Sequence, residues 1–502
     1  MEFIKNLPLF TIIIGFIGVV LTSILKRKPA KIVAIISESI ALAFGILVLV
    51  YTMSKGEYVI YQLGHLEAPF CNQIRFGPYE GLLATLVPLV MLLSVFAGDR
   101  HTHRDITEEK EHSFYTLLNL ILVAIISIIY TDDIFTGYVF LEISTLSSVG
   151  LTMIKNHGRQ IAAALRYMMF NLLGSGLFLL GCILLYGETG YLSMSFIQNT
   201  ITELFNSGSN TFALTISFTL IAIGLGIKSG LFPFYYWMGD TYGVNTTTAS
   251  SVLSGLISKG YIILLIKFIY RTFGIENVLK SDLLNILFVL GACGMIFGSI
   301  TAIRQKVINK MVSYSSAAQI GYIYLGIGLG EIGLVAATFH ILTHALCKPL
   351  LFSSSNRLID ASGKKRKFEN LKGTALADPV AGIGFTVGAL SMVGCPFFAG
   401  FISKYLFITD SFFDLSTTAS LLKAIITISA LVISTLLNTI YYLRTVITIY
   451  TPVKDSEVVL KRNKYDVLFM TSTIVFIILI IALGTYPAEI IKVIETGIKL
   501  LG

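Results

Sequence analysis

Three titratable residues follow one another at intervals of four in an otherwise apolar stretch. The segment HILTHALCKP contains His340, His344 and Lys348, and ends at Pro349. Four residues advance an α-helix by slightly more than one turn, so the three side chains share one stripe of a helix. Histidine changes charge near neutral pH, and burial lowers the pKa of a lysine toward that range. The stripe therefore predicts part of a proton relay, and Pro349 predicts an opening of the helix beside Lys348.

A metal site is the alternative for two histidines one helical turn apart. Zinc requires three or four ligands, and the neighbouring Cys347 lies on a different face of the predicted helix. The cysteines occur singly, without a CxxC pair, at positions 71, 182, 293, 347 and 395. We therefore expect no metal ion and no cofactor.

Four further ionisable side chains lie inside apolar stretches: Glu142, Lys228, Lys259 and Lys404. An ionised group near the centre of a bilayer costs at least about 2.5–3.5 kcal/mol, which favours a functional role. For Glu142 and Lys228 the alternative is a purely structural ion pair. For Lys404 it is a side chain that reaches to the membrane surface. Lys267 lies near a segment end, and we expect it to reach the surface in this way.

The composition indicates which elements carry these residues. Hydrophobic residues make up 55% of the 502 residues and charged residues 13%, about half the charged share of a soluble domain. Apolar runs long enough to cross a bilayer recur along the whole chain, which predicts an all-α integral membrane protein. We expect about fourteen transmembrane helices near residues 7–25, 32–53, 79–98, 113–130, 134–154, 162–186, 212–236, 246–270, 282–303, 308–329, 332–357, 379–407, 418–446 and 466–487. The first run lacks a small-residue cleavage site, so we interpret it as a membrane helix and not as a signal peptide.

Prolines interrupt the seventh and twelfth predicted helices at Pro233 and Pro396. A broken helix is tolerated in a membrane only where its backbone is buried in protein or lines a polar cavity. Two such breaks, five segments apart, are typical of transporters with internally repeated halves.

Basic residues gather in alternate loops, after predicted helices 1, 5, 9, 11 and 13; the loop after helix 13 contributes Lys454, Lys461, Arg462 and Lys464. The loops after helices 4, 6 and 10 contain no lysine or arginine. This pattern predicts cytoplasmic odd-numbered loops, both termini outside, and a location in the cytoplasmic (inner) membrane. It also accounts for the net charge of +8, so we expect no nucleic-acid partner. His101 and His103 belong to a polar segment, where we expect them to be solvated.

Several motifs together resemble the antiporter-like membrane subunits of proton-pumping NADH dehydrogenase and of related complexes. They are FLEISTLSSVG around Glu142, GIKSGLFPFYYWM around Lys228, ASSVLSGLISKGYI around Lys259, FHILTHALCKPLLF, and CPFFAGFISKYLF around Lys404. The resemblance covers about residues 80–445. It implies fourteen helices with two inverted five-helix repeats and broken helices 7 and 12. It also implies a coupled pair Glu142–Lys228, a relay at Lys259, a bridge at His340 and His344, and a terminal group at Lys404.

The same resemblance divides the chain into helices 1–3 (residues 1–105), a first repeat (106–275), a second repeat (276–450) and a C-terminal helix (451–502). A lysine at position 404 and the chain length favour the D subunit of Mrp-type cation/proton antiporters. The large membrane subunit of energy-converting hydrogenases is similar, and the chain has no long lateral helix after helix 14. Leu141 and Phe397 depart from the family pattern, which bears on packing and removes no charge.

The sequence thus predicts a proton-translocating subunit of a multi-subunit Na+/H+ antiporter in a lipid bilayer. Its expected partners are other membrane subunits, homologous antiporter-like and small ones, and its transported ions are protons, with sodium as an open possibility. The alternative is the equivalent ion-pumping subunit of a ferredoxin-dependent hydrogenase or complex I-like oxidoreductase, where any redox cofactor would belong to partners. A stand-alone solute transporter is a third hypothesis.

Overall fold

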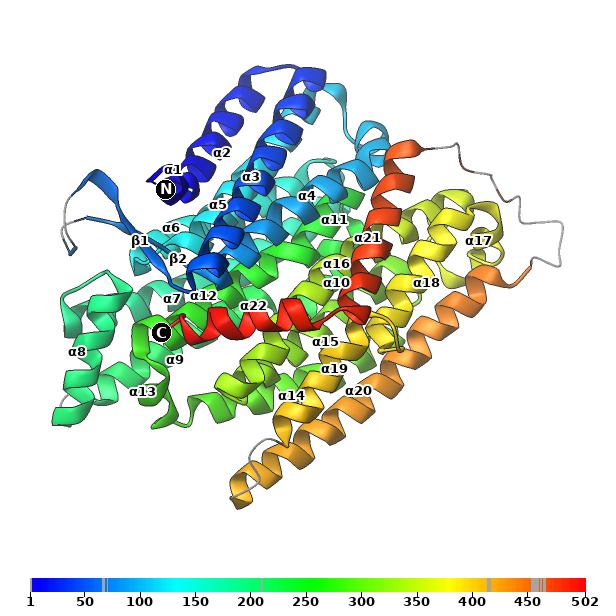
Figure 1. Ribbon diagram of the computed structural model, residues 1–502. Helices are drawn as coiled ribbons and strands as arrows, with labels where there is room; N and C mark the ends of the chain where they lie inside the picture. Colours follow the sequence, from blue (N-terminus) through cyan, green and yellow to red (C-terminus); the bar gives the residue numbers. More distant parts are fainter. Residues whose placement is uncertain are drawn as a thin grey trace.

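The computed structural model is a bundle of long helices (Figure 1). It describes residues 2–65, 68–69, 71–208, 211–412, 417–452, 460, 463 and 466–502. The basic residues Lys454, Lys461, Arg462 and Lys464 of the loop after predicted helix 13 lie outside the described residues.

The elements before the first predicted repeat are α1 (Glu2–Lys5), α2 (Leu7–Ile24), α3 (Arg27–Lys55), β1 (Val59–Gln62), η1 (Leu63–His65), β2 (Gln73–Phe76) and α4 (Pro78–Asp105). Those of the first repeat are α5 (Glu108–Tyr130), α6 (Ile134–Met153), α7 (Gly158–Thr189), α8 (Met194–Ser207), α9 (Thr211–Ser229), η2 (Phe234–Tyr236), α10 (Trp237–Val244), α11 (Thr247–Val252), η3 (Leu253–Ile257), α12 (Ser258–Lys267), η4 (Phe268–Phe273) and α13 (Ile275–Leu279).

Those of the second repeat are α14 (Leu283–Ile303), α15 (Ile308–Gly328), α16 (Glu331–Ala361), η5 (Phe368–Asn370), α17 (Thr374–Ala377), α18 (Pro379–Val393), α19 (Ala399–Ser411) and α20 (Thr418–Tyr450). The chain ends with α21 (Val467–Thr485) and α22 (Ala488–Lys499).

All fourteen predicted segments coincide with a helix or with consecutive helices. In the described part of the chain, 12 helical stretches are long and apolar enough to cross a membrane. The other two predicted segments are α15 and the interrupted pair α18–α19. The two five-segment sets, α5 to α12 and α14 to α20, begin at opposite faces of the bundle, so they are inverted relative to each other.

Both predicted breaks are present, and a glycine ends the first half of each broken helix. α9 is followed by Gly230, with φ of 80°, and α18 by Gly394, with φ of 93°. A left-handed residue at this position satisfies the last helical carbonyls and stops the helix. Pro233 and Pro396 lie after these turns, where they prevent the helix from resuming directly.

The loops after α2, α4, α6, α10, α14 and α16 meet at one face, which we call the basic face. Lys155 after α6 contacts both Asp105 at the end of α4 and the carbonyl of Asn245 after α10. At the opposite face, β1 and β2 form an antiparallel hairpin, and Ile74 of β2 pairs with Thr131 after α5. The alternation of loops that the sequence predicts is therefore present.

The hairpin and α22 were not predicted from the sequence. α22 lies across the bundle at a steep angle to α21 (Figure 1) and packs on α4 and α16. Its residues Ile494, Gly497 and Ile498 are buried against these helices. α22 has 12 residues and is too short to cross a bilayer. A prediction based on the length of apolar runs therefore does not detect it.

Glycines allow α14 and α15 to pack with their backbones in contact. A Cβ atom on Gly321 would overlap the Met295 nitrogen and would lie 2.7 Å from the Gly291 oxygen. Membrane helices associate largely through such close packing of small residues, because lipid supplies no hydrophobic drive between them.

We expect Gly321→Ala to destabilise the protein, because the added methyl group must push two backbones apart. Overpacking of this kind costs about 1–3 kcal/mol, which thermal unfolding in detergent would register as a lower Tm. Gly176→Ala is the matched control, since an added Cβ at that helical glycine meets no atom of a neighbouring element within 4 Å among the described residues. Equal Tm values for the two variants would contradict this packing.

Candidate functional site

The ion pair of Glu142 and Lys228 connects α6 to the end of α9. Lys228 Nζ donates to Glu142 Oε1 at 3.3 Å and to the Thr145 hydroxyl at 2.8 Å. Ser175 of α7 donates to the same Glu142 oxygen. The Lys228 side chain is fully buried, whereas that of Glu142 is 20% exposed. Glu142 is therefore the member of the pair that reaches the surface of this chain.

A cluster of hydroxyl groups leads from this pair toward α12. The Tyr261 hydroxyl lies 3.2 Å from both Ser144 Oγ and Thr145 Oγ1. The Tyr261 ring also faces Lys228, with 5.3 Å from Nζ to the ring centroid. Tyr261 follows Lys259 by two residues on the same helix, so the cluster connects two of the predicted relay positions.

Lys259 is buried at a local distortion of its helix. The preceding segment η3 is a π-helix, a form that is frequent at functional sites. Lys259 Nζ donates to the Ser254 carbonyl within η3, and to Ser258 Oγ at 3.2 Å. Ser254 Oγ lies 2.9 Å from Ser316 Oγ of α15. The Lys259 ammonium is thus surrounded by uncharged oxygen atoms and has no carboxylate partner in the described part of the chain.

Lys348 points from α16 toward α15. Its Nζ donates to the Val312 carbonyl at 2.9 Å and to Ser315 Oγ at 2.5 Å. The predicted opening at Pro349 is wrong, because α16 is continuous from Glu331 to Ala361. Gly255 of η3 packs directly against the proline, with 3.2 Å from its ideal Cβ position to Pro349 Cγ. Pro349 has no N–H group, so one backbone hydrogen bond of α16 is not formed at this turn. The contact with η3 buries this turn in protein, where such a gap is tolerated.

The two histidines differ in their surroundings. His340 Nδ1 is hydrogen-bonded to Ser403 Oγ at 2.6 Å, and its ring stacks on Tyr322 at 5.1 Å between centroids. Both ring nitrogens of His344, and Nε2 of His340, have no hydrogen-bond partner among the described residues. Buried polar atoms are usually hydrogen-bonded to protein or water, so these nitrogens stand out from the other polar atoms of the series.

Lys404 lies against the break between α18 and α19. Its Nζ donates to the Val393 carbonyl at 2.7 Å and to Thr435 Oγ1 at 2.8 Å. Val393 is the last residue of α18, where helix carbonyls are unsatisfied and carry partial negative charge. An ideal Cβ on Gly394 would lie 2.9 Å from Lys404 Cδ, so only glycine leaves room for this arrangement. A cavity of about 340 Å³ between α19 and α20 opens next to Lys404.

The structure brings the seven predicted residues into one series, in which six are buried and Glu142 is partly exposed. Lys259, Lys348 and the two histidines interact electrostatically with one another, and His340 also interacts with Lys404. Sequence reasoning did not identify the neutral groups between them, which are Thr145, Ser175, Tyr261, Ser315, Tyr322 and Ser403. Polar residues of these types are common in membrane helices, so only their position in the fold distinguishes them.

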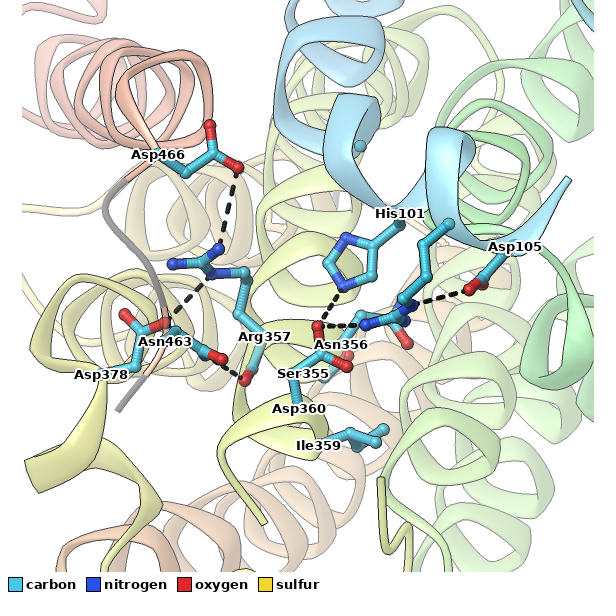
Figure 2. A network of polar contacts seen from close by, with 12 residues as sticks. His101, Asp105, Ser355, Asn356, Arg357, Ile359, Asp360, Asp378, Asn463 and Asp466 are labelled. Atoms are coloured by element: carbon cyan, nitrogen blue, oxygen red, sulfur yellow. Dashed lines mark hydrogen bonds and ion pairs between the residues drawn. The ribbon is translucent and has the colours of Figure 1, made fainter. Parts of the chain in front are cut away.

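A cluster of ion pairs lies at the basic face (Figure 2). His101 Nε2 donates to Asp360 Oδ2 at 3.0 Å, and Arg104 binds the same oxygen at 2.6 Å. Arg104 and Lys155 both bind Asp105, at 2.9 and 2.7 Å. The prediction that His101 is solvated is therefore wrong: it is 2% exposed, because α4 continues to Asp105 and carries it between neighbouring helices.

A cavity of about 280 Å³ adjoins this cluster and is lined by Lys155, Asn245 and Thr247 among others. Burial lowers the pKa of Lys155, although its ion pair with Asp105 opposes that shift. Thr247 is the first residue of α11, the helix that leads through η3 to Lys259. The cavity therefore reaches from the basic face to the start of the helical segment that carries Lys259.

A second charged network in Figure 2 fixes the end of α16. Arg357 Nε donates to Asp378 Oδ2 at 3.0 Å, and Arg357 pairs with Asp466 at 3.7 Å. The Asn463 amide donates to the Arg357 carbonyl at 2.9 Å. Because Asp466 precedes α21, these contacts tie α16 to the last membrane helix.

The expectation that Lys267 reaches the membrane surface is wrong. It is fully buried, and its Nζ donates to the carbonyls of Ile128 and Ile129 at 3.1 and 2.9 Å, as well as to that of Thr131. These carbonyls lie at the C-terminal end of α5, where cations are favoured. Lys267 is thus a helix cap inside the protein.

A buried ion pair follows one turn later. Arg271 donates to Glu80 Oε1 at 2.6 Å and to the Leu501 carbonyl at 3.0 Å. Asp132 lies 3.9 Å from the same guanidinium, and burial raises the pKa of its carboxyl group. These contacts join α4, η4 and the segment after α22 at the opposite face.

Comparison with known proteins identifies the family. Residues 131–434 match the model of the membrane domain described as "NADH:quinone oxidoreductase/Mrp antiporter, TM". The chain belongs to this family. The match spans all seven predicted relay residues, from Glu142 to Lys404.

Curated relatives include members from two kinds of assembly. "NADH-quinone oxidoreductase subunit N" of Desulforudis audaxviator is 31% identical over 89% of this chain and 86% of its own length. The D subunit of a Na(+)/H(+) antiporter of Bacillus subtilis is 26% identical over 83% of each chain.

Solved structures share the fold. An archaeal membrane-bound sulfane sulfur reductase chain covers 100% of this chain at 23% identity with a TM-score of 0.86. A chain of the Mrp complex from Dietzia sp. also covers 100% at 21% identity and a TM-score of 0.86. A chain of respiratory complex I from Thermus thermophilus gives a TM-score of 0.72 over 97% at 22% identity. Among the described residues, no group of three or more His, Cys, Asp or Glu side chains could hold a metal ion.

We expect Lys267→Met to lower the Tm of the protein, because it leaves carbonyls at the end of α5 without their charged donor. Hydrogen bonds to a charged group contribute about 1.5–3 kcal/mol each. Lys280→Met, at an exposed position, is the control and should leave the Tm unchanged. If Lys267 instead reached the lipid surface, the two variants would unfold at the same temperature.

Proposed function

We propose that the chain is a proton-translocating subunit of a multi-subunit, Mrp-type Na+/H+ antiporter. The observation that carries this proposal is the buried series Glu142, Lys228, Lys259, Lys348, His344, His340 and Lys404. Five ionisable groups and two histidines in the membrane interior would be a large cost without a use. A stand-alone solute transporter would instead need one midplane pocket with convergent polar contacts.

The proton passes along the series in short steps. A lysine that loses its proton leaves a neutral amine, which accepts a proton from the previous group through a hydroxyl or a water molecule. The Thr145–Tyr261 hydroxyl pair supports the step between Lys228 and Lys259, and Ser403 supports the step between His340 and Lys404. His344 connects the two halves, because its unpartnered ring nitrogens can bind and release a proton in turn.

Glu142 controls the charge state at one end of the series. When the Glu142–Lys228 pair is closed, the carboxylate holds the Lys228 proton; when it opens, burial favours release of that proton. A relay alone sets no direction, because one charge moved across the membrane is worth about 2.3 kcal/mol per 100 mV. The energy source therefore lies in partner subunits.

The subunit functions with other membrane subunits in the cytoplasmic membrane, with both termini outside and the basic face toward the cytoplasm. The partners include homologous antiporter-like subunits and small membrane subunits. Sodium is the exchanged ion in the Mrp-type assembly. The second candidate is the equivalent ion-pumping subunit of a complex I-like oxidoreductase or energy-converting hydrogenase, which the higher identity to the NADH-quinone oxidoreductase relative favours.

Purification of the intact complex followed by mass spectrometry distinguishes the two assemblies. Co-purifying antiporter subunits support the Mrp type, and subunits with iron–sulfur or hydrogenase signatures support the alternative. A protein that purifies alone from gently solubilised membranes would contradict both.

We expect Glu142→Ala and Lys259→Ala each to reduce proton transport at least about tenfold, because each removes one carrier from a series without a parallel path. Transport is measured in vesicles containing the intact complex, as the pH change driven by an ion gradient or by substrate oxidation. The control is Lys280→Ala, which removes an exposed lysine. Near-normal transport in both test variants would refute the relay.

We expect Ser403→Ala to slow transport several-fold without loss of assembly, since it deletes the hydroxyl partner of His340 Nδ1. Ser411→Ala on the same helix is the control, because its hydroxyl donates to the carbonyl of Ile408 within the same helix. Ser403→Thr keeps a hydroxyl and should retain most of the rate. A rate unaffected by Ser403→Ala would exclude this hydroxyl from the path.

A further inference from the structure

A second cavity opens at the basic face, between α7, α10 and α15, away from the predicted relay residues. Its volume is about 340 Å³, and its charged lining residues are Arg159, Arg166, Asp240, Lys310 and Arg366. None of them belongs to the buried series between Glu142 and Lys404.

Basic side chains outnumber acidic ones in the lining of this cavity. Asp240 binds both Arg166 and Lys310, the latter at 2.8 Å, so its carboxylate is already shared between two cations. Arg159 and Arg366 have no carboxylate within ion-pair distance among the described residues. Among these lining residues, Asp240 is already occupied and cannot bind a ligand ammonium group. The guanidinium groups of Arg159 and Arg366 can bind an anion.

The backbone that carries Arg366 is fixed. The Ile308 N–H donates to the Arg366 carbonyl at 3.3 Å, and the Phe368 N–H donates to the Lys306 carbonyl at 3.2 Å. Val307 and Lys367 form an antiparallel bridge between these bonds. The loop after α16 therefore holds Arg366 beside the start of α15.

The cavity continues into an apolar surface along α7. Ala162 lines the cavity with Arg166, and helical periodicity places Met169 and Leu173 on the same face as these two residues. Met169 is 71% exposed and Leu173 is 54% exposed. With a rise of about 1.5 Å per residue, this apolar surface begins about one turn deeper in the membrane than Arg166. An anion with an attached hydrocarbon chain matches both parts.

We propose that this cavity binds the phosphate group of an anionic phospholipid, with its acyl chains along the exposed face of α7. Guanidinium groups recognise phosphate through paired, charge-assisted hydrogen bonds, and basic pockets between membrane helices at the cytoplasmic side are suited to lipid headgroups. Arg159 and Arg366 bind the phosphate, while Arg166 and Lys310 stay bound to Asp240. The lipid joins α7, α10 and the loop after α16.

The test measures lipid-dependent stabilisation of the delipidated full-length protein, together with any partner subunits that co-purify. A ligand that binds the folded state raises the Tm with its concentration. We expect phosphatidylglycerol to raise the Tm at lower concentrations than phosphatidylcholine. In Arg159→Gln/Arg366→Gln, the half-saturating phosphatidylglycerol concentration should rise about twenty-five-fold, at roughly fivefold per charge.

Two further variants separate this site from a general charge effect. Lys26→Gln/Lys28→Gln removes two exposed charges, one just before α3 and one in its first turn, and should respond like the wild type. Arg159→Lys/Arg366→Lys should recover most of the phosphatidylglycerol response. An unchanged response of the double glutamine variant would overturn the proposal. So would an equal response of the wild type to phosphatidylcholine, or a Tm rise with inorganic phosphate alone that matches the one with phosphatidylglycerol.

Discussion

A buried ammonium group needs oxygen atoms to replace water, and helix breaks, distortions and ends supply them to three of the lysines. Lys404 uses the last carbonyl of α18, Lys259 uses a carbonyl of the π-helical segment η3, and Lys267 uses the end of α5. A regular helix keeps its carbonyls occupied by its own backbone. Helix breaks, distortions and ends thus compensate these three lysines, whereas Lys228 pairs with Glu142 and Lys348 uses the Ser315 hydroxyl.

The buried charges differ in how completely they are compensated. Arg271 is matched by Glu80, with Asp132 beside it, and Arg357 by Asp378, so these groups hold the structure together. Lys259 and Lys348 have only neutral oxygen partners, and His344 has no partner among the described residues. Partial compensation leaves the charged and neutral forms closer in free energy. This difference separates the proposed relay from the structural ion pairs.

The broken helix α9–α10 connects the two proposed sites. Its first half carries Lys228 in its last turn, where it pairs with Glu142, and its second half carries Asp240 at the edge of the proposed lipid cavity. The break allows the two halves to differ in direction. One predicted membrane segment therefore places a charged residue in the membrane interior and another at the basic face. Gly174 and Gly224 permit the close contact of α7 with α9 that this geometry requires.

The sequence by itself determined the fourteen apolar segments, the two breaks and the seven titratable positions, because apolar length, proline and isolated charge are local signals. The predictions for His101, Lys267 and Pro349 were wrong. The burial of the two side chains, and the continuity of α16 at the proline, depend on which helices pack against them. It did not reveal the hairpin, α22, or the hydroxyl groups of Tyr261 and Ser403 between the charges. Only the tertiary structure decided these features, because hydrogen-bond partners of a buried group come from residues far away in the chain, such as Ser403 for His340.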